Sequence, residues 1–230
     1  MAYRTVDASD HGVPQHRKRV IIIGNRGKRK FDFPDLKEMS PPCTLKKLFS
    51  ALPSIQSGEE KSSYLKRDTE QEKLLSFLGL AEPRVELPLT LHVARPHQPR
   101  DLEIYKLAAT AWRNDERRIH YPELPKRLQT HKNTKSFVDR FKVVAWERNA
   151  SHTVVAHIAK DGHYYIHPSV KQNRSLSPRE AARLQTFPDD FYFEGMSERP
   201  SRTAAFKQIG NAVPVLLAQR IAEAIMQGFF

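Results

Sequence analysis

Two arginines stand two positions apart at the start of an apolar run near the amino terminus. Gln15, Arg17 and Arg19 occupy alternate positions within the segment GVPQHRKRVIIIG, residues 12–24. Alternation along an extended segment lets one side chain point inward while its neighbour lies against the backbone. A guanidinium stays charged and donates through a planar fork, which suits a base edge or a phosphate. The segment therefore predicts a group of hydrogen-bond donors beside a strand. The alternative is a basic loop that binds nothing.

A second candidate site lies near the carboxyl end, in the segment QIGNAVPVLL. Asn211 precedes Pro214, and proline is favoured at the first position of a helix. The free N–H groups at a helix N-terminus favour a carboxylate or another anion. The turn that begins at Asn211 is therefore a candidate site for an anion. An asparagine cap without a ligand is the alternative.

Two short β-prone runs must position the arginines, over residues 3–6 and 19–24. The second run is continuously apolar and rich in β-branched residues, which predicts a buried strand. Because two strands alone do not form a stable sheet in water, we expect them to be edge elements of a larger sheet supplied by another part of the protein.

Three helices are predicted from caps and periodicity. One covers residues 69–80, with Leu74, Leu75 and Leu78 on its apolar side. Ser177–Glu180 forms a capping box with proline at the first helical position, so a second helix begins there. The last follows Pro214, with an apolar face at Leu217, Ala218, Ile221, Ala222 and Ile225. Residues 56–67 are polar, and we expect them to be mobile.

Composition indicates a polyanionic partner. The 230 residues carry a formal net charge of +12, concentrated in residues 1–30 and 91–180. Nucleic acid is the first candidate partner, and a basic but merely solvated surface is the alternative. A single cysteine, Cys43, excludes an internal disulfide and a cysteine-rich zinc site. No apolar run suits a membrane span, the first residues do not form a signal peptide, and a reducing cytoplasm is the expected location.

Three blocks, in this order, resemble the DNA (cytosine-5) methyltransferases. The family's Gln-x-Arg-x-Arg loop matches Gln15, Arg17 and Arg19, followed by a strand. Its Arg-x-Leu-Thr/Ser-x-Arg-Glu-x-Ala-Arg-Leu-Gln-x-Phe-Pro motif matches residues 174–188, and its Gln-x-Gly-Asn-x-Val-Pro motif matches residues 208–214. The blocks cover roughly a third of the chain, and they are the motifs of the family's carboxy-terminal half.

The resemblance implies methyl transfer from S-adenosylmethionine to carbon 5 of a cytosine that swings out of duplex DNA, at an unstacking cost of a few kcal/mol. Arg19 would reach the O2 edge of the cytosine. Arg17 would lie near a phosphate or brace the loop. Asn211, with the backbone of Ala212 and Val213, would contact the amino-acid end of the cofactor. Arg174, Arg179 and Glu180 would hold the recognition region to the catalytic half.

The family's covalent chemistry uses residues that we do not find in this sequence. A cysteine in a Pro-Cys-Gln loop attacks the base, a glutamate in Glu-Asn-Val holds it, and a Phe-x-Gly-x-Gly turn holds the cofactor. Cys43 follows two prolines, but Thr44 stands where glutamine is expected and the block follows the arginine loop. We therefore expect Cys43 to be an unreactive thiol.

Residues 91–170 occupy the place of the family's variable target-recognition region. Residues 151–168 resemble a hairpin of one branch of the family, and the Asp161-Gly162 pair suits its turn. His152, His157, His163 and His167 need not converge, so we expect no metal site. Base and phosphate contacts require basic side chains, and residues 91–170 offer many, Lys142 among them. The main candidates for DNA binding are Arg95, Arg100, Arg113, Lys126, Arg127, Lys132 and Arg140.

The expected fold class is α/β: the edge of a class I methyltransferase (Rossmann-like) sheet plus a mixed α+β target-recognition domain. The expected divisions are residues 1–55 for the partial core with its connector, 56–90 for a linker and helix, 91–190 for target recognition, and 191–230 for the return to the core. The expected partners are duplex DNA and a complementing N-terminal methyltransferase subunit or upstream segment, in a restriction-modification setting. The alternatives are a non-catalytic DNA-binding module of the same origin and an RNA-binding protein.

Overall fold

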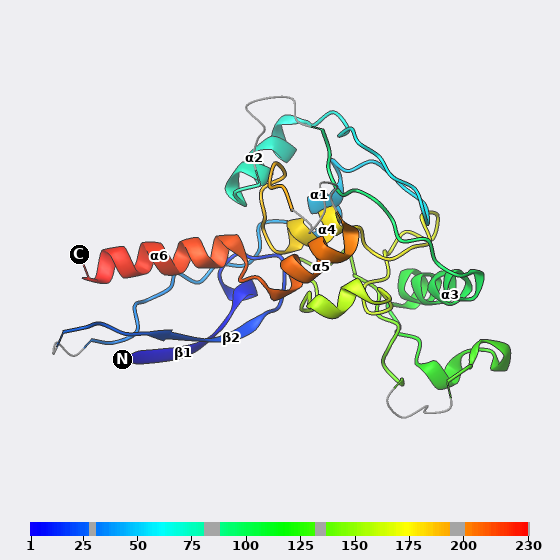
Figure 1. The fold of residues 1–230 in the computed structure, drawn as a ribbon, viewed down its shortest axis with the longest axis horizontal. Helices are drawn as coiled ribbons and strands as arrows, with labels where there is room; N and C mark the ends of the chain where they lie inside the picture. The colour runs from blue at the N-terminus through cyan, green and yellow to red at the C-terminus, as the bar shows by residue number, and fades with distance from the viewer. Residues whose placement is uncertain (28–30, 81–87, 132–136, 194–200, 230) are drawn as a thin grey trace.

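The computed structural model describes residues 1–27, 31–80, 88–131, 137–193 and 201–229. A central body contains α1, α4 and α5. Strands β1 and β2 extend from it alongside α6, while α3 lies at the opposite end (Figure 1). The elements are β1 (Ala2–Asp7), η1 (Ala8–Asp10), β2 (Lys18–Ile23), α1 (Leu45–Phe49), α2 (Thr69–Phe77), α3 (Pro99–Asp115), η2 (Tyr121–Glu123), η3 (Lys126–Leu128), η4 (Ala156–Ala159), α4 (Pro178–Leu184), α5 (Arg202–Asn211) and α6 (Val215–Phe229).

Strands β1 and β2 form an antiparallel pair in which Tyr3 lies opposite Ile22 and Thr5 opposite Val20. One face of this pair is open to solvent: Tyr3 is 75% exposed, Ile22 64% and Val20 59%. The prediction of a strand is confirmed, but the prediction that it is buried is wrong. Alternate side chains of a strand point to opposite faces, and in the described part of the chain only one face is covered.

The covered face of the sheet joins the main hydrophobic core. Ile21 and Ile23 pack against a cluster to which the start of α6 contributes Leu216 and Leu217. The predicted apolar face of α6 is confirmed at Leu217, which is buried, and at Ile221, which packs against the core. It is wrong at Ala218 and Ala222, which are exposed, while Leu216 is buried instead.

The stretch Arg202–Gly228 has the length and composition of a candidate membrane span, with a third of it buried inside the protein. It is not one continuous helix, because α5 has 10 residues and α6 has 15, with Ala212 to Pro214 between them. A bilayer-crossing helix needs about 20 apolar residues. Neither helix alone has that length.

Helix α4 lies at the centre of the body, and all seven of its residues are buried. Its predicted capping box is confirmed: Ser177 Oγ accepts from the Glu180 amide, and Glu180 accepts from the Ser177 amide at 2.8 Å. Glu180 also receives two hydrogen bonds of 2.7 Å from Arg174, which is fully buried. The pair is therefore buried away from solvent, whereas its expected role in holding the recognition region to the catalytic half stays a prediction.

The predicted capped helix at residues 69–80 corresponds to α2, where Asp68 and Gln71 form a capping box and Leu74, Leu75 and Leu78 are buried. Residues 56–67, for which we predicted mobility, make several backbone hydrogen bonds, and their mobility stays a prediction. Their backbone is held by hydrogen bonds from Leu65 to Ala51 and from Lys61 to His92. The hydroxyl of Tyr64 also donates to the carbonyl oxygen of Asp189 at 3.3 Å.

Residues 104–166 contain a second, smaller core built from α3, η2 and η3, with Tyr105, Tyr121 and Phe141 buried together. The predicted hairpin over residues 151–168 is wrong, because the η4 turn occupies its first arm and Ile166 forms only isolated bridges with Val143 and Ser175. Gly162 does take the expected positive φ of 79°. Among the described residues of this region, β structure is limited to such bridges, so the mixed α+β expectation is not met there.

Candidate functional site

The three sequence blocks meet in one buried hydrogen-bond network centred on Gln15. Its Nε2 donates to Gln185 Oε1 at 3.0 Å and to the carbonyl oxygen of Leu184 at 3.4 Å. Its Oε1 accepts from the Val154 amide. Gln185 Nε2 in turn donates to the carbonyl oxygen of Ile209 at 2.7 Å. Segments that lie up to 170 residues apart in sequence are thus joined through two amide side chains.

Arg17 is inside this network rather than on a surface. Only 2% of it is exposed; its Nη1 donates to the carbonyl oxygen of Val154 at 2.7 Å and its Nη2 to that of Gly210 at 3.1 Å. Burial, with the charge of Arg19 as a smaller cause, lowers the pKa of Arg17 to about 10. It remains charged at neutral pH. Of the two roles expected for Arg17, these contacts correspond to bracing the loop.

Close approach of α5 to η4 depends on Gly210. A Cβ atom built on Gly210 would lie 2.2 Å from the Ala156 nitrogen and 2.4 Å from the Val155 carbonyl carbon. Real Cβ atoms do not approach backbone atoms so closely, so any side chain here forces the two segments apart. Glycine is therefore required for the Gly210 carbonyl to meet Arg17.

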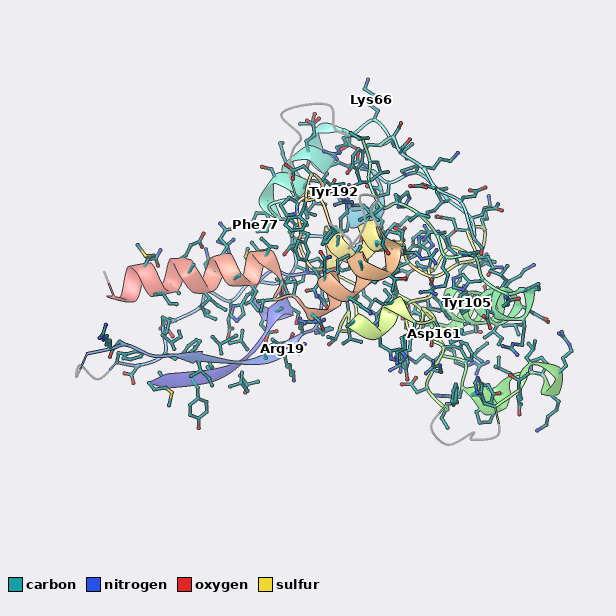
Figure 2. All side chains as sticks on the ribbon, in the orientation of Figure 1. Arg19, Lys66, Phe77, Tyr105, Asp161 and Tyr192 are labelled. Carbon is teal, nitrogen blue, oxygen red and sulfur yellow. The ribbon has the colours of Figure 1, made fainter. Side chains whose placement is uncertain are left out.

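Arg19 is exposed at the start of β2, where the strand meets the body of the molecule (Figure 2). Its Nη1 donates to the carbonyl oxygen of Lys18 at 2.7 Å, and among the described residues no carboxylate pairs with it. The loop thus presents one buried and one exposed guanidinium, which agrees with the expectation that neighbouring arginines point in different directions.

Asn211 is the last residue of α5, and the turn from Ala212 to Pro214 leads into α6. Asn211 is exposed, and its side-chain amide makes no hydrogen bond to the described residues. Val213 is 45% exposed. The amide of Ala212, however, is occupied by the carbonyl oxygens of Gln208 and Ile209. Asn211 therefore offers a polar group to a ligand, whereas the backbone of Ala212 does not offer its N–H.

The expectation of free N–H groups at the start of the last helix is corrected by two contacts. The Val215 amide donates to the carbonyl oxygen of Gln185 at 3.1 Å. The Leu216 amide donates to Thr186 Oγ1 at 2.9 Å. Thr186 is fully buried with a positive φ of 55°, and it follows the end of α4. The α4 end therefore caps α6, which the sequence did not reveal because the two partners are 30 residues apart.

The candidate DNA contacts have different surroundings. Arg95 donates to the carbonyl oxygens of Lys160 and Ala159, so it closes the end of η4. Arg127 pairs with Glu103, and Arg140 with Asp161. Three further candidates are exposed: Arg100, Arg113 and Lys126. Arg100 is bonded to Thr130 and lies 3.8 Å from the Asp101 carboxylate, and Arg113 is bonded to Asn114. Lys132 lies outside the described residues.

Cys43 is only 8% exposed, and burial raises the pKa of its thiol to about 11. A nucleophilic cysteine requires a thiolate at neutral pH. Cys43 is therefore a packing residue of the main core, to which it belongs.

The histidines of residues 151–168 each have a separate environment. His152 Nε2 donates to the Tyr164 carbonyl oxygen, His163 Nδ1 lies 2.8 Å from the Tyr105 hydroxyl, and His167 is buried beside Glu180. Within the described ranges, no three His, Cys, Asp or Glu side chains gather as a metal site would require.

Comparison with known proteins agrees with this arrangement. The family model "C-5 cytosine-specific DNA methylase" matches residues 1–227. "Type II methyltransferase M.Bpa9945I" of Bacillus paralicheniformis is 44% identical over 226 residues, which are 96% of this chain and 49% of that protein. "Type II methyltransferase M.DdeI" of Desulfomicrobium norvegicum is 30% identical over 96% of this chain and 52% of its own length. The chain thus spans about half the length of these curated relatives.

A solved structure shares the fold. The crystal structure of a putative DNA modification methyltransferase encoded within a prophage of E. coli has a TM-score of 0.56 and 20% sequence identity, over 98% of this chain and 59% of that one. The family match over nearly the whole chain is decisive: the chain belongs to the C-5 cytosine-specific DNA methylase family.

Proposed function

We propose that this chain is the carboxy-terminal, DNA-recognising part of a DNA (cytosine-5) methyltransferase of a restriction-modification system. The observation that carries the proposal is the buried network in which Gln15 and Arg17 meet Gln185 and Gly210. Each of the three sequence blocks contributes residues to this network, so the blocks form one structural unit. Arg19 is exposed at the edge of that unit, where an extruded base can be reached.

In this proposal the buried residues hold the loop in place, and the exposed residues contact the base and the cofactor. Arg17 and Gln15 fix the loop, and Arg19 donates to the O2 edge of the cytosine. S-adenosylmethionine supplies the methyl group when bound, and the exposed amide of Asn211 fits its amino-acid end. The N-terminus of α6 would stabilise the cofactor's carboxylate less than an open helix end would. Two of its amides already donate to the Gln185 carbonyl oxygen and to Thr186 Oγ1.

The attacking cysteine would come from a complementing subunit or an upstream segment. The buried Cys43 thiol, with its pKa near 11, is unsuited to the reaction. The open face of β1 and β2, with Tyr3, Val20 and Ile22, is an apolar surface of the kind that marks a protein contact. We propose that the rest of the methyltransferase sheet covers this face, since the relatives are about twice as long as this chain.

A chimera tests the proposal. The part of the Bacillus paralicheniformis relative that this chain does not match is fused to it, and methyl transfer to mixed-sequence duplex DNA is measured with labelled S-adenosylmethionine. We expect methylation by the chimera and by the full-length relative, and none by the lone chain. Turnover by the lone chain would refute the division of tasks. A folded chimera that binds DNA without methylating it would instead support the non-catalytic binding module.

A further inference from the structure

A cavity of about 440 Å³ opens in the recognition region between residues 140–142, 152–157 and 164–165. Its walls carry Arg140, Lys142, His152, His157, Tyr164 and Tyr165. Arg140 is one of the main candidates for DNA binding named from the sequence, and Lys142 is a further basic residue of the same region. Cations, imidazoles and phenol rings around one opening are groups that donate hydrogen bonds to an anion.

Tyr164 lies between the two cations of the cavity. The Arg140 guanidinium is 5.6 Å from the centre of its ring, and the Lys142 ammonium is 5.2 Å away. Both cationic side chains are about four-fifths buried. Cation–π contacts of this kind hold the charges in place. The Tyr164 hydroxyl has no hydrogen-bond partner within the described part of the chain, so it is available to a ligand.

The charges around the cavity do not cancel. Arg140 is paired with Asp161, which lies beyond η4 near Tyr105 of α3 (Figure 2). Lys142 and Arg118 share a single carboxylate, Asp139, at 2.7 Å and 3.1 Å. Counting Arg118, which does not itself line the cavity, three cations share two carboxylates. His152 adds no charge at neutral pH, because burial lowers its pKa to about 4.

The cavity wall is continuous with the arginine loop. Thr153 donates to the carbonyl oxygen of His16 at 2.6 Å, and the next residue, Val154, accepts from Arg17. The Tyr165 hydroxyl donates to the Thr153 carbonyl oxygen at 2.9 Å and accepts from the Val155 amide at 3.1 Å. Any group held in the cavity is therefore placed at a fixed position relative to the loop.

We propose that this cavity binds one phosphodiester group of duplex DNA, with Lys142, which shares its carboxylate with Arg118, and the Tyr164 hydroxyl as hydrogen-bond donors. The inference rests on the proposed function and deepens it, by giving the DNA strand an anchor next to the arginine loop. Such a contact positions the duplex without reading its sequence.

The test is duplex binding by the purified chain over a range of salt concentrations, followed by fluorescence anisotropy. One lost phosphate contact lowers the slope of log K against log salt by about 1. Lys142→Gln should show that change and bind roughly eightfold more weakly at 0.1 M salt, on duplexes of unrelated sequence alike. Lys142→Arg should restore most of the slope. Lys73→Gln on α2, which removes an exposed cation paired with Glu70, is the matched control and should bind as the wild type does.

The outcomes separate this inference from the proposed function. If the wild-type chain does not bind duplex DNA, both fail. If it binds and Lys142→Gln keeps the wild-type slope and affinity, the phosphate pocket is refuted while the proposed function stands. Weaker binding confined to some sequences, with an unchanged slope, would also refute it, in favour of base readout. Thermal unfolding checks that each variant is folded; should Lys142→Gln unfold, Lys142→Met, which keeps the aliphatic stem against Tyr164, carries the same test.

Discussion

Arg17 donates a hydrogen bond to the carbonyl oxygen of Gly210, 193 residues further along the chain, at 3.1 Å. This contact ties the arginine loop to the turn that contains the candidate cofactor residue Asn211. Since Arg17 has almost no exposed surface, its charge stabilises the fold, and under the proposed function the exposed Arg19 is the one that meets the substrate.

The first prediction concerns the division of labour between these two arginines. Arg17→Met should lower the free energy of unfolding by about 2–4 kcal/mol, because it leaves the buried carbonyls of Val154 and Gly210 without donors. Arg19→Met, the matched control, should change it by less than about 0.5 kcal/mol. Urea unfolding measures both. Equal effects of the two substitutions would contradict the assigned roles.

Gly210→Ala should disturb the junction between α5 and η4. The added methyl group would lie 2.2 Å from a backbone nitrogen, so the segments must separate and the Arg17 contact must lengthen. We expect a loss of roughly 2–4 kcal/mol in unfolding free energy, at the upper end of the usual range for single substitutions. Gly24→Ala, where a Cβ meets nothing within 4 Å, is the control and should be nearly neutral.

Removing one charge of the buried pair of Arg174 and Glu180 should lower the free energy of unfolding strongly. Glu180→Gln leaves the Arg174 guanidinium buried and uncompensated, which typically costs about 3–5 kcal/mol. The expected result is a large fall in the unfolding midpoint in urea. Glu223→Gln removes a carboxylate from a half-exposed pair with Arg220 and should have little effect. A Glu180→Gln variant as stable as the wild type would show that the pair is dispensable.

Stability should fall as the pH drops below about 6.5. Burial lowers the pKa of His97 to about 3, of His152 to about 4 and of His167 to about 3, whereas these side chains titrate near 6.5 in the unfolded chain. The unfolded state therefore binds more protons between pH 6.5 and 4, and the stability present above that window is lost as the pH falls.

With all three histidines contributing, the unfolding free energy should drop by about 4 kcal/mol per pH unit near pH 5. The Glu180 carboxyl, whose pKa is held below its usual range by Arg174, extends the loss below about pH 4.5. Urea unfolding at constant ionic strength from pH 8 to 5 gives the slope. His152→Gln should reduce the slope by about one third, and a flat profile would contradict the prediction.

Cys43 should be unreactive and unnecessary for methyl transfer. Its thiol is buried and its pKa is raised to about 11, so alkylation by iodoacetamide at pH 7 should proceed far more slowly than for a free thiol. Cys43→Ala in the chimera should leave the rate of methylation unchanged when the protein is folded. Loss of methylation by a folded Cys43→Ala chimera would overturn this reading of the site.

Local signals predicted much of the fold. The caps of α2 and α4, the proline before α6 and the strand at residues 19–24 were visible in the sequence, because each depends on neighbouring residues. The Asp161-Gly162 turn was also visible, but the hairpin around it was not formed. The Tyr165 hydroxyl bonds instead to the backbone of Thr153 and Val155, and η4 forms in place of a strand.

Long-range contacts account for what the sequence did not reveal. Gln185 and Thr186 appeared only as members of a motif, and their bonds to Ile209 and Leu216 depend on packing between segments far apart in the chain. Lys142 stood out in the sequence only as one of many basic residues, and Tyr164 gave no signal, because what distinguishes them is the cavity that they share. The roles of Arg19 and Asn211 in base and cofactor binding remain predictions.

The open face of β1 and β2 has a consequence for how the chain behaves in a cell. Tyr3, Val20 and Ile22 present an unshielded apolar surface on a two-stranded ribbon. Chains that display such surfaces are captured by chaperones, degraded by proteases or drawn into aggregates. The steady-state amount of this polypeptide should therefore rise and fall with whatever covers the ribbon, which would keep surplus copies scarce without any dedicated control of their synthesis.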